Sequence, residues 1–108
     1  MNKELHTKEM ENLFRGVLTL KTVEECYDFF QDFCTINELL SLSQRFEVAG
    51  MLRQKQTYLE VAKKTGASTA TISRVNRCLV YGNGSYEMVY SRLEEQERGD
   101  QEKTEQGE

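Results

Sequence analysis

The residues best suited to a chemical role are basic side chains concentrated in one stretch of the chain, residues 53–80. That stretch carries six cations and one acid, Glu60, so its charge is +5 in a chain whose net charge is −4. The cations are Arg53, Lys55, Lys63, Lys64, Arg74 and Arg77. Clustered lysine and arginine side chains neutralise phosphates, which is the electrostatic signature of a nucleic-acid-binding face. The acidic remainder, with a charge of −9, discourages non-specific attraction to phosphate elsewhere.

Short polar side chains lie beside two of these arginines. They are Ser68, Thr69, Thr71 and Ser73, next to Arg74 and Arg77. Short side chains let a helix approach base edges closely, and a threonine methyl group can contact the methyl group of thymine. The two arginines can reach guanine edges or phosphates. The other cations, and a helix start that donates backbone N–H groups, are expected to contact phosphates and so position the protein without reading sequence. These residues are Lys63, Lys64, Lys55, Arg53, Thr57 and Tyr58.

Residues 57–79 contain the signals of two helices joined by a tight turn. Thr57 and Glu60 have the spacing of a capping box, which starts one helix, and Ser68 can cap the next. Gly66 lies between the two helices, where glycine accepts the left-handed backbone that ends a helix. The small and apolar residues that would hold the pair together are Val61, Ala62, Ala67, Ile72 and Val75. This pattern predicts a helix-turn-helix over residues 57–79, whose second helix would enter the major groove of double-stranded DNA.

The other segments are also predicted to be helical, so the expected fold class is all-α with six helices. Apolar spacing predicts a first helix over residues 3–20. Two further capping boxes, each a threonine with a glutamate three residues later, start the second and third helices. They are Thr22 with Glu25 and Thr35 with Glu38. The third helix should run to about Arg53, and Ser85 caps a last helix.

Composition predicts one helical domain followed by a tail. We expect residues 1–97 to form the domain and residues 98–108 to form a disordered acidic tail, because the latter are charged, polar or glycine. No apolar run approaches the roughly 18 residues needed to cross a membrane. Residues 1–10 are polar and mixed in charge, unlike a signal peptide.

Cysteine and histidine usage argues against metal binding and catalysis. The three cysteines are an odd number and lack CxxC spacing, which is typical of reduced, buried thiols in a cytoplasmic protein. They are Cys26, Cys34 and Cys78. The one histidine, His6, lies near the N-terminus, so four well-placed zinc ligands are not available. The chain also lacks a Gly-rich phosphate loop and a plausible Cys–His pair. We therefore expect no metal, no cofactor and no enzymatic activity.

At the helix-turn-helix the sequence resembles a known family. GASTATISRVNRCL, residues 66–79, is similar to the recognition-helix segment of the Trp repressor family, and LRQKQTYLEVAKKT, residues 52–65, resembles the segment that precedes it. The chain as a whole is most similar to the YerC/YecD group of Trp-repressor-like proteins, over about residues 5–95. The resemblance implies an intertwined homodimer with this six-helix fold, acting as a sequence-specific transcriptional regulator, in particular a repressor.

The resemblance also implies an effector pocket, which in the Trp repressor depends on two arginines, a glycine and a serine. One arginine corresponds to Arg74, and the other falls on Gln44, with Arg45 adjacent. The glycine and the serine become Val75 and Cys78. A candidate pocket therefore lies near Arg45, Arg74, Val75 and Cys78. Because the Val75 side chain would fill space that an indole ring needs, tryptophan is not expected to be the effector, and the effector stays unknown.

One alternative from a different functional class remains open. The acidic remainder of the chain weakens its overall attraction to DNA, so the chain could be a protein-interaction module that keeps the fold without binding DNA. Salt dependence separates the two functions, because DNA binding through several lysine and arginine contacts must weaken steeply as salt rises.

Overall fold

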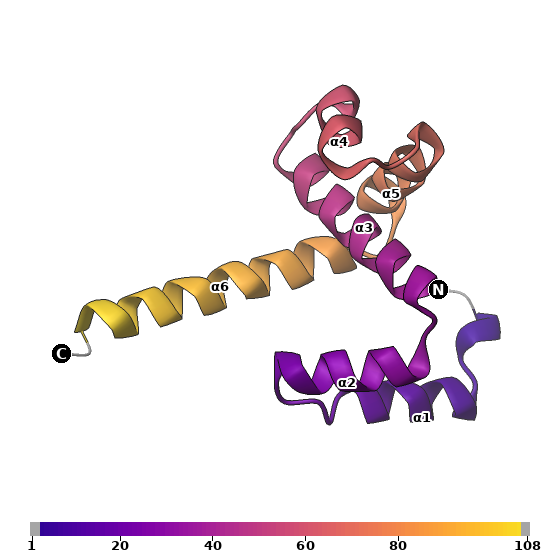
Figure 1. Cartoon of the computed structure of the whole chain (residues 1–108), viewed down its shortest axis with the longest axis vertical. Coiled ribbons are helices and arrows are strands. Elements are labelled where there is room, and N and C mark those ends of the chain that lie inside the picture. The colour runs from indigo at the N-terminus through magenta and orange to yellow at the C-terminus, as the bar shows by residue number, and fades with distance from the viewer. Residues whose placement is uncertain (1–2, 107–108) are drawn as a thin grey trace. The chain divides into compact units, whose positions relative to one another are not determined.

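A computed structural model describes residues 3–106, with side chains through residue 103, and contains six α-helices after a short 3-10 turn (Figure 1). The 3-10 turn is Lys3–Leu5, and the helices are α1 (Lys8–Val17), α2 (Val23–Phe33), α3 (Ile36–Arg53), α4 (Tyr58–Thr65), α5 (Thr69–Tyr81) and α6 (Ser85–Gln106). No strand occurs in residues 3–106. The all-α, six-helix class predicted from the sequence is confirmed. None of the helices in this part of the chain is long and apolar enough to span a membrane.

Side-chain caps place most of these helix starts where the sequence predicts them. The Thr22 hydroxyl accepts the Glu25 N–H at 3.1 Å, and the Thr35 hydroxyl accepts the Glu38 N–H at 3.1 Å. The first helix differs from the expected range of 3–20. Thr7 has extended backbone and caps α1, because its side chain accepts the N–H of Met10. The helical stretch is therefore interrupted at Thr7 and ends at Val17.

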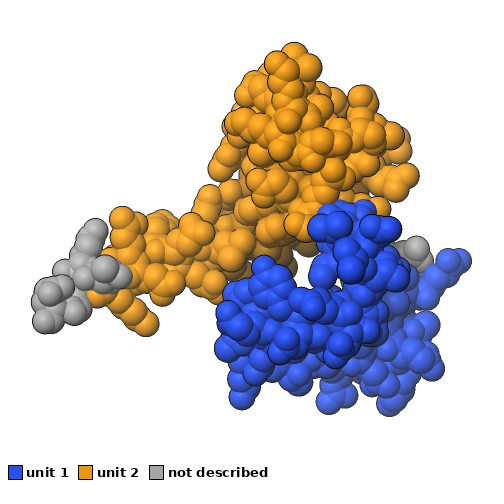
Figure 2. Space-filling model, in the orientation of Figure 1, with its two compact units in different colours: residues 1–42 blue, residues 43–108 orange. Residues whose placement is uncertain are grey.

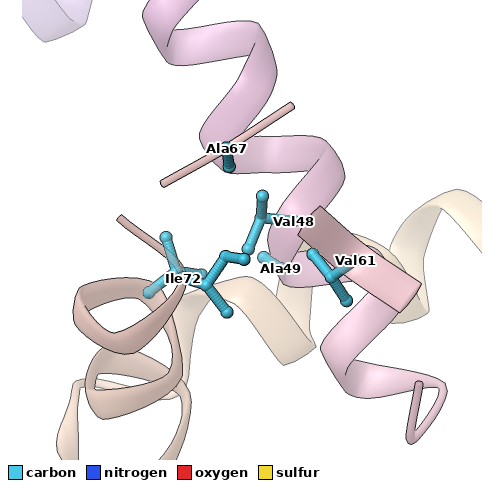
Figure 3. Packing of buried hydrophobic residues seen from close by; sticks show 6 residues of the cluster. Val48, Ala49, Val61, Ala67 and Ile72 are labelled. Carbon is cyan, nitrogen blue, oxygen red and sulfur yellow. The ribbon is translucent and has the colours of Figure 1, made fainter. Parts of the chain in front are cut away.

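The chain divides into two compact units, residues 1–42 and residues 43–108 (Figure 2). The buried core lies in the second unit, where side chains from α3, α4, the α4–α5 turn and α5 converge (Figure 3). These side chains are Val48, Ala49, Val61, Ala67, Ile72 and Val75. Because α3 supplies the base of this core, it fixes where α4 and α5 lie.

The first unit leaves most of its apolar side chains uncovered. No residue of α1 or α2 is buried, although the Phe29 ring stacks on Phe33 at 5.2 Å and meets Phe30 edge-on at 5.3 Å. Leu18 is 82% exposed and Ile36, in the first turn of α3, is 78% exposed. The apolar faces predicted for the first helices are therefore present, but a single chain does not bury them.

Helix α6 is attached to one side of α3 through Tyr90. The Tyr90 ring stacks on Phe46 with centroids 4.5 Å apart, and its hydroxyl donates to the Phe46 carbonyl. Gly50 provides the space, since a Cβ at that position would lie 2.6 Å from the Tyr90 hydroxyl oxygen. Burial, followed by the nearby Glu47 carboxylate, raises the pKa of Tyr90, so the hydroxyl stays protonated and able to donate.

Two expectations differ from the structure. Helix α6 continues to Gln106, well past residue 98, where the sequence predicted a disordered tail to begin. Glutamate, glutamine, arginine and lysine are good helix formers, so a polar segment extends a helix that has already been started. The cysteine thiols are free, but Cys26 and Cys78 are exposed rather than buried.

Candidate nucleic-acid interface

The α4–α5 unit is held by a three-residue turn with a defined geometry. Gly66 has left-handed backbone, with φ 72° and ψ 7°, and its N–H donates to the Ala62 carbonyl. The Thr65 hydroxyl donates to the Val61 carbonyl at 2.7 Å and accepts the Ala67 N–H at 3.1 Å. Ser68 then caps α5. These bonds satisfy backbone groups at both helix ends, so the turn sets the angle between α4 and α5.

The start of α4 is fixed by the predicted capping box. The Thr57 hydroxyl accepts the Glu60 N–H at 3.2 Å and also donates to the Glu60 carboxylate at 3.0 Å. The Thr57 side chain is therefore engaged in capping α4. Tyr58, the first residue of α4, is exposed and free of such a role.

Helix α5 has a buried side and an exposed side. Ile72 and Val75 belong to the core, whereas Thr69, Ser73, Arg74 and Arg77 are exposed. No salt bridge within the described residues involves either arginine. The Ser68 hydroxyl accepts the Thr71 N–H and donates to the Thr71 hydroxyl, both at 3.1 Å, so these two side chains stabilise the helix start. Thr69, Ser73 and the two arginines remain available to a ligand.

A groove of about 560 Å³ runs along the exposed side of α5 and reaches α4 at Tyr58. Its lining combines two guanidinium groups, hydroxyl and amide groups, and aromatic and aliphatic surface. The lining residues are Tyr58, Ala70, Ser73, Arg74, Asn76, Arg77, Val80 and Tyr81. The structure thus brings together four of the predicted site residues, Tyr58, Ser73, Arg74 and Arg77. Sequence reasoning missed Ala70, Asn76, Val80 and Tyr81, although all but Asn76 lie on the same helical stripe as Ser73 and Arg77.

The lysines lie on α4 and on the link that precedes it, outside the groove. Lys63 and Lys55 are exposed, and Lys64 donates to the Gln56 side-chain oxygen at 3.3 Å. Lys55 has φ 68° in the link between α3 and α4. These three lysines, together with Arg74 and Arg77, are the five cations of residues 54–80. Glu60 is the one acid there, so the segment has a charge of +4.

The sequence predicted that Arg53 contacts phosphate, but in the structure its side chain is bonded to two glutamates of α6. Its guanidinium donates to Glu87 at 2.6 and 3.0 Å and to Glu94 at 2.9 and 3.1 Å, and its side chain is only 18% exposed. These bonds raise the pKa of Arg53 and lower the pKa of both glutamates. The guanidinium also lies 5.7 Å from the centre of the Tyr90 ring. Arg53 therefore joins α3 to α6 instead of facing a ligand.

The residues expected near an effector pocket have different surroundings in the single chain. Val75 is 2% exposed and fills the core, as the sequence predicts. Arg74 lines the groove on the exposed side of α5, but Arg45 and Cys78 do not line it. Gln44 donates to the Thr65 carbonyl at 3.2 Å and so supports the end of α4. Nor do the described residues contain a group of three or more His, Cys, Asp or Glu side chains that could hold a metal ion.

An exposed basic helix that follows a glycine turn and packs on a core shared with α3 and α4 is an arrangement typical of helical DNA-binding regulators. The chain belongs to the Trp repressor protein family, whose sequence profile matches residues 8–94. It is 58% identical over 94 residues to the YerC protein of Bacillus subtilis, covering 87% of this chain and 90% of YerC. It is also 38% identical over 61 residues to a Trp operon repressor homolog of Chlamydia caviae, covering 56% of this chain and 60% of that protein.

Solved structures confirm the Trp-repressor-like fold. A TrpR-like protein from Eubacterium eligens superposes with a TM-score of 0.83 at 64% identity, covering 85% of this chain and 95% of that one. A Staphylococcus aureus structure gives the same TM-score at 49% identity, covering 85% of this chain and 92% of the other. The resemblance inferred from residues 52–79 is therefore confirmed for the family and the fold.

Proposed function

We propose that this protein is a sequence-specific DNA-binding transcriptional regulator, acting as a repressor, whose α4–α5 unit is a helix-turn-helix. The observation that carries the proposal is the exposed side of α5, where Arg74 and Arg77 face outward beside short polar side chains while Ile72 and Val75 anchor the helix. A helix presented in this way can lie in the major groove with its N-terminal residues at the base edges. The Chlamydia caviae relative, named as a Trp operon repressor homolog, supports the same reading.

The proposed active form is a homodimer in the cytoplasm. Large exposed apolar side chains on α1, α2 and the first half of α3 support this, because a monomer in water rarely leaves so much apolar surface uncovered. They include Phe14, Leu18, Val23, Tyr27, Phe33, Ile36 and Leu40. A dimer would present two α5 helices to half-sites about one DNA turn apart, roughly 34 Å.

Tryptophan is not the proposed effector. Val75 occupies core space next to Ile72, so the position at which the resemblance places a glycine is filled by a branched side chain. The regulator either works without a small molecule or responds to a different one.

The test is a binding titration on the operator found by genomic footprinting in the native cell. The double variant Arg74→Ala/Arg77→Ala should lose at least tenfold in affinity, about 1.4 kcal/mol. The logarithm of the wild-type association constant should also fall linearly with the logarithm of salt concentration. Arg92→Ala is the matched control, because Arg92 is an exposed arginine on α6, away from the groove.

Two outcomes would contradict the proposal. One is an unchanged affinity in the double variant, and the other is the absence of any salt-sensitive binding to duplex DNA. The second outcome would favour the alternative of a protein-interaction module, which a regulator fold can become once its basic helix no longer meets phosphate.

A further inference from the structure

The charged side chains that line the groove on α5 are all positive. Arg74 and Arg77 supply two cations, and none of the eight lining residues is an acid. Tyr58 and Ser73 add hydroxyl groups that can donate hydrogen bonds, and Asn76 adds an amide. A guanidinium and a hydroxyl together match the oxygens of a phosphate, because both donate and neither competes as an anion.

The groove is open, which limits what it can hold. Tyr81 is 83% exposed on one rim, and Val80 beside it is also exposed. Small-molecule sites bury most of their ligand, so this groove would leave such a ligand largely in water. An extended polyanion that passes over the surface does not need enclosure, because its affinity comes from charge neutralisation and counterion release.

The groove extends from the first turn of α5 toward the far end of the helix. Ala70 lines it in the first turn, whereas its neighbour Thr69 is exposed and does not line it. Arg77, Val80 and Tyr81 line it about two to three turns beyond Thr69. In helix-turn-helix proteins the N-terminal residues of the second helix meet base edges. Residues further along and across the turn are then placed to meet the backbone that borders the groove of the DNA.

We propose that this groove seats one phosphate of the DNA backbone, and that Arg74 and Arg77 therefore bind the backbone rather than read bases. This inference rests on the proposed function. Arg77 and Arg74 donate to the phosphate oxygens, the Tyr58 hydroxyl donates from the α4 side, and Tyr81 and Val80 contact the adjoining sugar. Sequence is then read by the first turn of α5, with Thr69 as the exposed side chain nearest the bases.

The experiment combines protein variants with operators that carry one uncharged phosphate. In each operator a single methylphosphonate replaces one phosphate of the half-site, and affinities are measured for the wild type, Arg77→Ala, Tyr58→Phe and the control Arg92→Ala. When the methylphosphonate replaces the phosphate that sits in the groove, the affinity of the wild type should fall about tenfold. On that operator Arg77→Ala should bind almost as well as the wild type, because the phosphate charge that Arg77 would contact is already absent. The affinity loss caused by Tyr58→Phe should likewise be smaller on that operator than on the unmodified one. The effect of Arg92→Ala should be the same on all the operators.

A second measurement separates backbone contacts from base contacts. Arg77→Ala should weaken binding by the same factor on the operator, on single-base-pair variants of it and on unrelated duplexes, and it should reduce the salt slope by about one. Thr69→Val should instead change the ranking of the operator variants.

The inference is overturned if Arg77→Ala relaxes discrimination at one base pair and adds fully to every methylphosphonate loss, since Arg77 would then read that base. Such a result leaves the proposed function intact. If the wild type binds no duplex DNA, the proposed function itself has failed.

Discussion

Two residues at the borders of α4 have left-handed backbone, Lys55 with φ 68° and Gly66 with φ 72°. At Gly66 this conformation costs little, because glycine has no Cβ. At Lys55 it belongs to the end of α3, where the Gln56 N–H donates to the Met51 carbonyl at 3.1 Å and the Lys55 N–H donates to the Leu52 carbonyl at 3.0 Å. This is the bonding of a Schellman cap, which normally places glycine where Lys55 stands.

Exchanging the residue type at these positions should change stability in opposite directions. Lys55→Gly should raise the free energy of unfolding by about 0.5–1 kcal/mol, because strain is relieved. Gly66→Ala should lower it by about 1 kcal/mol, since nothing lies within 4 Å of an added Cβ and only the backbone conformation is penalised. Urea denaturation measures both changes.

The control is Gly16→Ala within α1, where an added Cβ also meets nothing within 4 Å. Alanine should be neutral or stabilising there, because it has the higher helix propensity. A destabilised Gly16→Ala protein, or a destabilised Lys55→Gly protein, would mean that the backbone argument is wrong.

Residue types along the chain predicted much of this detail. The conformation of Gly66 and the threonine caps at the starts of α2, α3 and α4 follow from local rules, since each depends on neighbours within a few positions. The burial of Val75 was predicted from the apolar pattern of the helix pair. Lys55 was predicted as a cation only, because lysine carries no signal for left-handed backbone. Its conformation is imposed by the way α3 ends and α4 begins.

Among the elements, α3 and α6 are joined by a cluster of Arg53, Glu87 and Glu94. The Glu87 pKa is lowered first by its hydrogen bond with Arg53 and then by the bond with Ser91, and the Glu94 pKa is lowered by Arg53. Each carboxylate therefore has a lower pKa in the folded chain than in the unfolded chain. Such groups stabilise the fold above the ordinary glutamate value of 4.5, and that contribution is lost as pH falls through the lowered values.

The double variant Glu87→Gln/Glu94→Gln should therefore be less stable than the wild type near neutral pH. The two melting temperatures should converge as pH is lowered below 4.5, because the wild-type carboxylates then become protonated as well. Thermal unfolding followed by circular dichroism from pH 7 to pH 3 measures the difference. Glu95→Gln on the same helix should keep the wild-type pH profile, and parallel curves for the double variant would show that the cluster does not stabilise the fold.

The sequence could not reveal this cluster, since Arg53 lies 34 residues from Glu87 and 41 from Glu94. A count of charges within a window sees only neighbours along the chain, so Arg53 was assigned to the basic segment. The extent of α6 was missed for a related reason. Composition separates charged segments from apolar ones, but a charged segment that continues a docked helix keeps its backbone hydrogen bonds.

In the whole molecule, the sequence predicted which faces are apolar but not which of them one chain covers. The only buried core in the described residues belongs to residues 43–108. The apolar side chains of residues 1–42 are largely exposed. Periodicity identifies a face that avoids water, and it cannot say whether the same chain or a second copy supplies the partner surface.

If a second copy covers this surface, Ile36→Asp should convert the dimer into a monomer. In an isolated chain the change costs little, because Ile36 is exposed, whereas an unpaired carboxylate buried at an interface is strongly unfavourable. Sedimentation at several concentrations measures the assembly. The control Leu59→Asp, at an exposed apolar position on α4, should leave the sedimentation of the dimer unchanged.

A wild-type protein that sediments as a monomer at all concentrations would contradict the dimer. A melting temperature that rises with protein concentration would agree with it, because only the folded state associates. The Ile36→Asp protein should lose that concentration dependence.

The connection between α5 and α6 has one more consequence. Only residues 82–84 separate the two helices, and three residues can span at most about 11 Å. Because Tyr90 and Arg53 tie α6 to α3, the far end of α5 is tethered to the same helix that supplies the base of the core. Both ends of the α4–α5 segment are therefore connected to α3, directly at its start and through α6 at its end. Detaching α6 from α3 would leave the far end of α5 free to move. Affinity for DNA would then fall through added entropy of the unbound helix, with every contact residue still in place.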